Sequence, residues 1–260
     1  DETPVRQLDP GKGKTKHAYL WAYRSNTLGD DPPIVIFDYQ AGRGGVHAAN
    51  FLGDWTGALM VDDFAGYKRL FRGEAVELAC MAHARRKFFD LHKAHGSPIA
   101  AEALRRIGEL YEIEAQAKGK TVEVRALLRQ AQSQPLLEAL KLWLLHTRQS
   151  VANGGALAKA IDYSLKRWSA FARYAENGVY PIDNNPVENA IRPICLGKKN
   201  WLFAGSEAAG KRAAVIQSLL KTACLNGIEP MAWLTDTLEK LPTWPNRRLD
   251  ELLPIKKLPA

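Results

Sequence analysis

Carboxylates at the ends of predicted strands are the first candidates for chemistry in this sequence. Asp62 directly follows the four apolar residues 58–61, so its side chain should stand at the carboxyl end of a buried strand. This is the edge at which α/β sheets carry functional groups. Asp63 and Asp38 occupy similar positions, and Asp is common in turns for purely local reasons. Position alone therefore does not choose among these three carboxylates.

A second acidic candidate lies in the segment Asp183-Asn-Asn-Pro-Val-Glu-Asn-Ala-Ile-Arg-Pro. Glu188 and Arg192 are four residues apart, on one face of a predicted helix. Asn185 can cap this helix with Pro186 at its first position, because proline lacks only a donor that would be unpaired there. Glu188 then lies in the first turn. The local alternative is a surface ion pair.

Cations and aromatic residues are interleaved further along the chain. Lys198-Lys-Asn-Trp-Leu-Phe-Ala-Gly-Ser places Lys198 and Lys199 beside Trp201, a composition suited to phosphate contact and base stacking. Core aromatic residues beside a solvated basic turn would give the same pattern. A second cationic group, with a solvated helix face as its alternative, consists of Arg85, Arg86 and Lys87.

Four possible zinc ligands also lie close together in the sequence. Cys80 and His83 are three residues apart, and His92 and His95 repeat that spacing. The second pair follows inside a predicted helix at less than the usual finger spacing, and the set offers one thiolate. We therefore do not expect a zinc site here.

The composition is typical of a globular protein with a basic surface. The 260 residues are 46% hydrophobic and 25% charged, enough for one large core or two modest ones. The net charge of +8 should attract polyanions, nucleic acid first among them. Three widely spaced cysteines indicate reduced thiols, and no apolar run is long enough to span a bilayer. We expect a cytoplasmic protein without a membrane segment.

The elements that must position these residues change character along the chain. Short runs typical of strands occur up to residue 81, and the continuous apolar run at 34–37 suggests burial on both faces. From 82 to 177 the pattern is that of successive helices. Predicted strands are 17–23, 34–37, 58–61 and 75–81, and predicted helices are 46–55, 211–225 and 230–240. Breaks in the helical stretch are expected near 96–98, 118–120, 133–135 and 153–155.

Four long motifs, in the same order, resemble the transposases of the bacterial insertion sequence 66 family. The likeness runs from Asp1-Glu-Thr-Pro-Val to Asn226-Gly-Ile-Glu-Pro-Met-Ala-Trp-Leu, nearly the whole chain. The motifs are Leu59-Met-Val-Asp-Asp-Phe-Ala-Gly-Tyr, Cys80-Met-Ala-His-Ala-Arg-Arg-Lys-Phe-Phe, the segment that begins at Asp183, and Gly197-Lys-Lys-Asn-Trp-Leu-Phe-Ala-Gly-Ser.

The resemblance implies an α/β fold of the ribonuclease H-like type, with a mixed five-stranded sheet, flanking helices and a large all-helical insertion. Matched position by position, the catalytic triad of the family falls on Asp1, Asp62 and Glu188. The implied parts are 1–81 for the first part of the core, 82–178 for the insertion, 179–225 for the second part of the core with Glu188, and 226–260 for a helical tail.

The implied activity is that of a DDE transposase. Three carboxylates can hold two Mg²⁺ ions, with Mn²⁺ as a substitute, because these ions prefer hard oxygen ligands. In-line hydrolysis of a phosphodiester would be followed by attack of the freed 3′ hydroxyl on target DNA. Candidate DNA contacts are Arg85, Arg86, Lys87, Arg192, Lys198, Lys199 and Trp201.

The implied partners are DNA, both element ends and target, and further copies of the protein on that DNA in a bacterial nucleoid. Two alternatives stay open: a non-catalytic DNA-binding remnant, and a ribonuclease H-like nuclease without strand transfer. The family also has an amino-terminal region that recognises the element ends. We therefore expect the sequence to be a fragment, a mis-assigned start or a decayed element.

Overall fold

The computed structural model describes residues 1–255, and the chain divides into two compact units. Unit 1 contains Asp1–Gly53 and Asn185–Ala260, and unit 2 contains Asp54–Asn184. Unit 1 is thus built from both ends of the sequence, whereas unit 2 is one continuous stretch. Within residues 1–255, no helix is both long enough and apolar enough to cross a lipid bilayer.

Unit 1 contains a three-stranded antiparallel sheet in the order β1–β2–β3. Buried side chains alternate with more exposed ones along β1 and β3, so one face of the sheet is buried in a core. In β2 the consecutive residues Leu20, Trp21 and Ala22 are all buried. Ile36 in β3 is 40% exposed, and the prediction that this run is buried on both faces was wrong. The strands are β1 (Glu2–Asp9), β2 (Lys14–Arg24) and β3 (Val35–Gln40).

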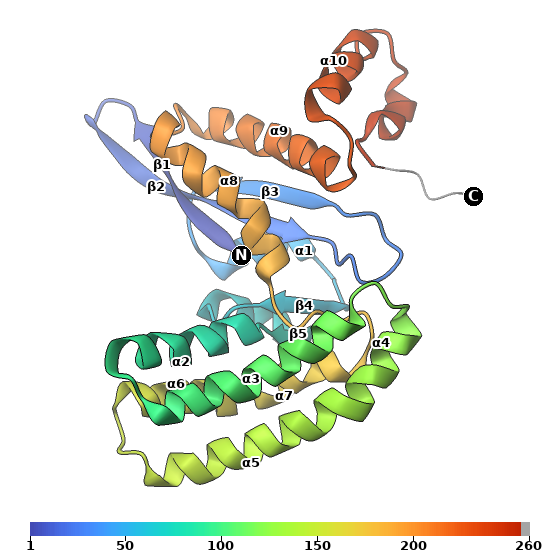
Figure 1. Cartoon of the computed structure of the whole chain (residues 1–260). Coiled ribbons are helices and arrows are strands. Elements are labelled where there is room, and N and C mark those ends of the chain that lie inside the picture. The colour runs from blue at the N-terminus through green and yellow to red at the C-terminus, as the bar shows by residue number, and fades with distance from the viewer. Residues whose placement is uncertain (256–260) are drawn as a thin grey trace. The chain divides into compact units, whose positions relative to one another are not determined.

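Two long helices, α8 (Asn185–Trp201) and α9 (Glu207–Leu225), cover this buried face of the sheet (Figure 1). Two polar side chains of α9 fix it to β3. Ser218 Oγ accepts a hydrogen bond from Phe37 N at 2.8 Å, and Thr222 Oγ1 accepts one from Val35 N at 3.2 Å. The start of α8 agrees with the prediction, whereas α9 begins four residues earlier than predicted.

The other face of the sheet carries α1 (Gly45–Leu52). The rings of Tyr23 and Phe51 are stacked with centroids 3.8 Å apart, and Trp21 lies against His47. Because aromatic pairs of this kind contribute more than their buried area alone, they hold the short helix on the sheet.

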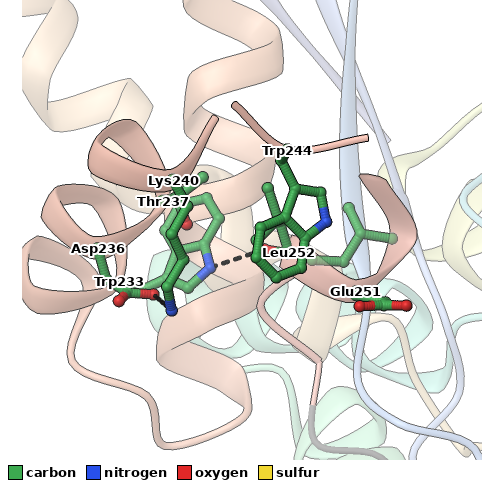
Figure 2. A pocket seen from close by; sticks show the side chains of 8 residues that line it. Trp233, Asp236, Thr237, Lys240, Trp244, Glu251 and Leu252 are labelled. Carbon is green, nitrogen blue, oxygen red and sulfur yellow. Dashed lines mark hydrogen bonds and ion pairs between the residues drawn. The ribbon is translucent and has the colours of Figure 1, made fainter. Parts of the chain in front are cut away.

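The carboxyl-terminal part of unit 1 consists of α10 (Pro230–Lys240) and the 3₁₀ helix η4 (Asn246–Leu252). A pocket of about 250 Å³ lies here. Figure 2 shows the side chains that line it, among them Trp233 and Trp244. Trp233 Nε1 donates to the main-chain oxygen of Leu252 at 3.0 Å, so this polar group is satisfied within the fold. None of the predicted site residues lines the pocket.

Unit 2 begins with a parallel pair of strands, β4 (Ala58–Val61) and β5 (Val76–Ala79), linked through the 3₁₀ helix η1 (Ala65–Arg72). A helical bundle follows, with a core that includes Phe88, Leu110 and Ile161. Its helices are α2 (Met81–His95), α3 (Pro98–Ala117), α4 (Val122–Leu128), α5 (Gln134–Ser150), α6 (Ala156–Lys166) and α7 (Trp168–Ala172), with a π-helical turn, η2 (Arg129–Ser133), and a 3₁₀ turn, η3 (Arg173–Glu176).

Three of the four predicted helix breaks are confirmed, near 96, 119 and 154. Gly96 ends α2 in the left-handed conformation, at φ +60°, where glycine has no Cβ penalty. The break predicted at 133–135 was wrong. The chain stays helical from α4 through the π turn into α5. Pro135 has no N–H to donate to the preceding turn, and the π turn just before it accommodates this missing hydrogen bond.

The chain is therefore a mixed α/β protein dominated by helices. Its described strands form one sheet of three and one of two, and a single five-stranded sheet is not seen among residues 1–255. The division of the sequence at residues 81, 178 and 225 stays a prediction.

Candidate active site

Asp62 stands directly after the last residue of β4, as the sequence predicts. Its carboxylate Oδ1 accepts a hydrogen bond from Phe64 N at 2.8 Å, which closes a tight turn and orients the side chain. The side chain is half-buried. Asp62 is thus a fixed carboxylate at the carboxyl end of a strand.

Asp63 has a different environment. Its side chain is 48% exposed, and Oδ1 lies 3.8 Å from Arg167 Nε. The two neighbouring carboxylates are therefore not equivalent. The Asp62 carboxylate accepts a hydrogen bond from the backbone N–H of Phe64, whereas the Asp63 carboxylate lies near the Arg167 guanidinium.

Arg167, which the sequence did not single out, lies at the junction of α6 and α7 with 9% of its side chain exposed. Nη2 donates to Glu77 Oε1 at 2.7 Å and to the main-chain oxygen of Asp62 at 3.0 Å. Burial alone lowers the pKa of a guanidinium. The hydrogen bond from Arg167 to Glu77 and nearby negative charge outweigh burial, so the pKa of Arg167 is raised and its charge is retained.

In unit 1, Asp1 lies on the face of the sheet that α8 covers. Ala22 N donates to the main-chain oxygen of Asp1 at 2.8 Å, so the β1–β2 ladder extends to this residue. Alternate residues of a strand share a face, which places Asp1 with Thr3. Thr3 Oγ1 in turn lies 3.3 Å from Cys195 Sγ of α8.

Glu188 lies at the same end of unit 1 as the start of β1, because α8 and β1 run in the same direction. Cys195 contacts Thr3, and further along both segments Ala204 N donates to the main-chain oxygen of Arg6 at 2.8 Å. Glu188 precedes Cys195 by about two helical turns. It therefore lies toward the first residue of the chain. Figure 1 shows the start of α8 near the N-terminal marker.

The predicted triad is divided between the two units, with Asp1 and Glu188 in unit 1 and Asp62 in unit 2. Among residues 1–255, no group of three or more His, Cys, Asp or Glu side chains is placed to hold a metal ion. Each unit by itself supplies only a part of the predicted triad, so the triad stays a prediction.

The segment just before α8 is anchored inside unit 2. Tyr111 donates its hydroxyl hydrogen to Asp183 Oδ2 at 2.8 Å, and Cys80 Sγ donates to Asn184 Oδ1 at 2.9 Å. Burial raises the pKa of the Cys80 thiol to about 11, so the thiol is protonated at neutral pH. Two polar residues of the Asp-Asn-Asn-Pro motif therefore have structural partners.

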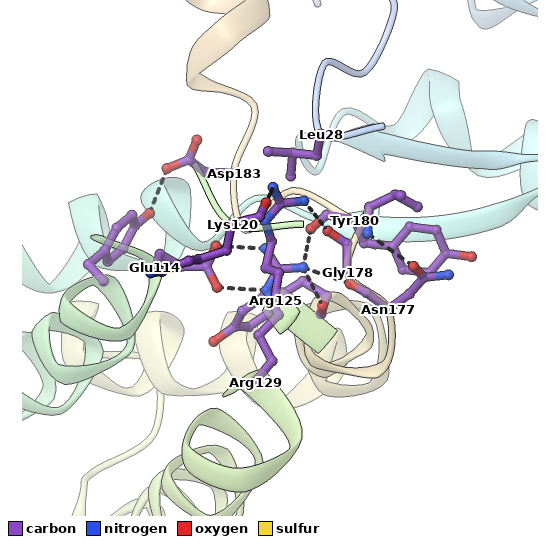
Figure 3. A network of polar contacts seen from close by, with 12 residues as sticks. Leu28, Glu114, Lys120, Arg125, Arg129, Asn177, Gly178, Tyr180 and Asp183 are labelled. Atoms are coloured by element: carbon purple, nitrogen blue, oxygen red, sulfur yellow. Dashed lines mark hydrogen bonds and ion pairs between the residues drawn. The ribbon is translucent and has the colours of Figure 1, made fainter. Parts of the chain in front are cut away.

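Two arginines of the helical bundle hold the loop that leads to this segment (Figure 3). Arg129 Nη1 lies within 3.0 Å of the main-chain oxygens of Tyr174, Asn177 and Tyr180. Arg125 Nη1 donates to the main-chain oxygen of Gly178 at 2.6 Å. A Cβ at Gly178 would come within 2.0 Å of the Val122 carbonyl oxygen, so this close approach requires glycine.

The predicted DNA contacts differ in their surroundings in the folded chain. Lys198 Nζ donates to Thr3 Oγ1 at 2.9 Å and to the Pro4 carbonyl oxygen at 3.1 Å, a structural contact with β1. Lys87 Nζ lies 4.3 Å from the centre of the Tyr163 ring. The remaining candidates are exposed to solvent: Arg85, Arg86, Arg192, Lys199 and Trp201.

The end of α8 presents apolar side chains to solvent. Trp201, Leu202 and Phe203 are all exposed, and Leu202 has a φ of +62°, a conformation that is uncommon for a residue with a side chain. Trp201 is therefore available for stacking, two residues after the exposed Lys199 in the sequence.

Comparisons with known proteins give a consistent result. A family model described as Transposase IS66 family matches residues 1–212, and one described as IS66 C-terminal element matches residues 218–255. No solved structure matches the chain.

Three similar proteins come from Sinorhizobium fredii. The uncharacterized protein y4qI is 38% identical over 267 residues, which cover 98% of this chain and 49% of y4qI. The uncharacterized protein y4jD is 36% identical over 266 residues, which cover 98% of this chain and 52% of y4jD. The uncharacterized protein y4hP is 39% identical over 255 residues, which cover 90% of this chain and 46% of y4hP. The chain thus spans about half the length of these relatives.

Proposed function

Because the chain belongs to the IS66 family of transposases, we propose that it forms the catalytic part of an enzyme that cuts and joins DNA during transposition of an insertion sequence. The observation that carries this proposal is the match of the family model to residues 1–212. That range includes Asp1, Asp62 and Glu188, together with the exposed cations of α2 and α8.

We propose these three carboxylates as the metal ligands. Their oxygen donors suit Mg²⁺ or Mn²⁺ and include no softer ligand. Two features support the assignment: Asp1 and Glu188 lie at one end of unit 1, and Asp62 is an oriented carboxylate at the end of β4. When bound, two metal ions would activate the attacking oxygen and stabilise the leaving oxygen.

The proposed fold is the ribonuclease H-like sheet of this catalytic class. A mixed sheet of five strands needs both antiparallel and parallel pairs. The chain has five described strands, with antiparallel pairing in β1–β2–β3 and parallel pairing in β4–β5. The helices of unit 2 then correspond to the insertion between the strands and Glu188.

DNA is the proposed substrate, as element ends and as target, with several copies of the protein acting together on it. The cations that support binding are the ones exposed to solvent, above all Arg192 and Lys199 on α8. Side chains of this kind contact phosphates and position the duplex without reading its sequence. Trp201 would stack on an unpaired base.

Two other functions would use the same fold. A DNA-binding remnant would bind DNA without cutting it. A nuclease without strand transfer would cut but leave the 3′ hydroxyl unjoined. The four long motifs favour the transposase over both, since carboxylates alone would suit a nuclease equally well.

The test is an assay of nicking and of strand transfer on DNA that carries the element ends, with Mg²⁺ or Mn²⁺ present. We expect metal-dependent nicking and joining, both lost in Glu188→Gln. Glu207→Gln is the matched control, because Glu207 is an exposed glutamate in the first turn of α9 that pairs with Lys211. DNA binding without nicking in the wild-type protein would support the remnant, and nicking without joining would support the nuclease.

A further inference from the structure

We infer that Arg167 is a positioning residue for the carboxylate of Asp62, a role that rests on the function proposed above. The arginine lies 105 residues after Asp62 in the sequence, yet its Nη2 donates to the main-chain oxygen of Asp62 at 3.0 Å. The same nitrogen lies 3.4 Å from the main-chain oxygen of Val61, the last residue of β4. Arg167 therefore holds the backbone at the point where the strand ends.

The guanidinium is itself fixed from several sides within unit 2. Nε and Nη2 donate to Glu77 Oε1 of β5 at 3.1 and 2.7 Å, and Nη1 donates to the Tyr163 hydroxyl at 3.1 Å. The rings of Tyr163 and Phe171 lie 5.7 and 5.8 Å from the guanidinium carbon. A planar group with this many partners has little freedom to turn, so it is a rigid support.

Asp62 is consequently held at two places by different donors. Arg167 binds its carbonyl oxygen, and Phe64 N binds Oδ1 of its side chain at 2.8 Å. The first contact fixes the peptide plane between Asp62 and Asp63, and the second fixes the rotation of the side chain. Together they define the direction of the remaining carboxylate oxygen, which a metal ligand requires.

Arg167 also separates the roles of the two neighbouring aspartates. Its Nε lies 3.8 Å from Asp63 Oδ1, whereas its contact with Asp62 is through the main chain. Because the cation attracts the Asp63 carboxylate, that side chain is drawn toward Arg167. The carboxylate of Asp62 instead accepts the hydrogen bond from Phe64 N that closes the turn.

The experiment measures Mn²⁺ binding to the chain, by electron paramagnetic resonance of free Mn²⁺, in Arg167→Lys. Lysine keeps the charge and loses the planar fork. We expect Mn²⁺ affinity to fall by about 10- to 100-fold, the usual effect of removing a group that orients a metal ligand. The matched control is Arg148→Lys in the same unit, because Arg148 also binds a carboxylate, Asp162, at 2.7 Å and a main-chain oxygen at 3.0 Å. We expect the control to bind Mn²⁺ as the wild-type protein does.

Each outcome decides between the two proposals. An unchanged Mn²⁺ affinity in Arg167→Lys, combined with weakened binding in Asp62→Asn, overturns the positioning role alone. Absence of Mn²⁺ binding in the wild-type protein, or wild-type binding in Asp62→Asn, overturns the proposed metal site instead.

A general loss of structure would change the unfolding transition, whereas loss of the positioning contact alone would not. We expect this transition to be similar in Arg167→Lys and Arg148→Lys. If Arg167→Lys does not fold, Glu77→Gln takes its place, since Glu77 anchors the guanidinium. Weaker Mn²⁺ binding is then expected in Glu77→Gln, and an unchanged affinity overturns the positioning role.

Discussion

Arg129 and Glu114 form a buried ion pair with two hydrogen bonds, Nε to Oε1 at 2.7 Å and Nη2 to Oε2 at 2.6 Å. The arginine side chain is 0% exposed. Its remaining nitrogen, Nη1, donates to three main-chain oxygens of the loop 174–180, so each of the three guanidinium nitrogens has an acceptor. A buried charge of this kind costs stability unless it is paired, and here the pairing is complete.

Arg129→Met should destabilise the protein by about 3–5 kcal/mol, because it leaves Glu114 and the loop carbonyls without their partner. The measurement is the free energy of unfolding in urea, and the matched control is Arg105→Met. Arg105 also forms two hydrogen bonds with a glutamate, Glu102, but this pair is at the surface and should give no measurable change. Equal effects of the two substitutions would show that burial of the Arg129 pair contributes nothing.

Asp62→Asn should abolish metal-dependent nicking and leave the unfolding transition in place, since the amide oxygen can still accept from Phe64 N. Asp63→Asn should keep most of the activity, because Asp63 lies at the surface near Arg167. Both are measured as the initial rate of nicking at saturating Mg²⁺. Full activity in Asp62→Asn with loss in Asp63→Asn would reverse the assignment of the metal ligand.

The Cys80 thiol should make stability depend on pH in the alkaline range. Burial raises its pKa from 9.0 to about 11, so the thiol is neutral in both states below pH 9 and its contribution is fully present there. As pH rises from 9 to 11, the unfolded thiol ionises first and stability falls, by at most about 1.4 kcal/mol per pH unit.

This contribution is obtained from unfolding in urea under reducing conditions between pH 8 and 11. The fall should be smaller in Cys80→Ala than in the wild-type protein and unchanged in Cys224→Ala, because Cys224 is exposed. The same slope in all three proteins would contradict a raised pKa at Cys80.

Much of the fold could be predicted from the sequence, because the local signals are strong. The run 58–61 agrees with β4, and α10 has its predicted bounds because Glu229 caps a helix with Pro230 in its first turn. The failures have physical causes. The exposure of Ile36 depends on which helices cover the sheet, and helix continuity at Pro135 depends on a π turn.

The candidate site could be predicted only in part for the same reason. Asp62 has a local signature, a carboxylate that ends an apolar run and closes a turn. Arg167 and Arg129 have none, because each acts on residues far away in the sequence, Asp62 and Tyr174 among them. The segment around Lys198 has the composition of a phosphate contact, yet the Lys198 ammonium donates hydrogen bonds to Thr3 and Pro4. Contacts of this range become visible only in the folded chain.

Lys198 and Lys199 are neighbours with different predicted effects on DNA binding. Three to five phosphate contacts would give a slope of log affinity against log salt of roughly −3 to −4.5 for the wild-type protein. Lys199→Ala should make this slope less steep by about 0.9, because its exposed ammonium would neutralise one phosphate. Lys198→Ala should leave the slope nearly unchanged and lower the unfolding free energy, because its ammonium binds β1. Fluorescence anisotropy with labelled DNA at several salt concentrations measures both slopes. A slope that is insensitive to Lys199→Ala, or a larger effect of Lys198→Ala, would show that Lys199 is not the phosphate contact on α8.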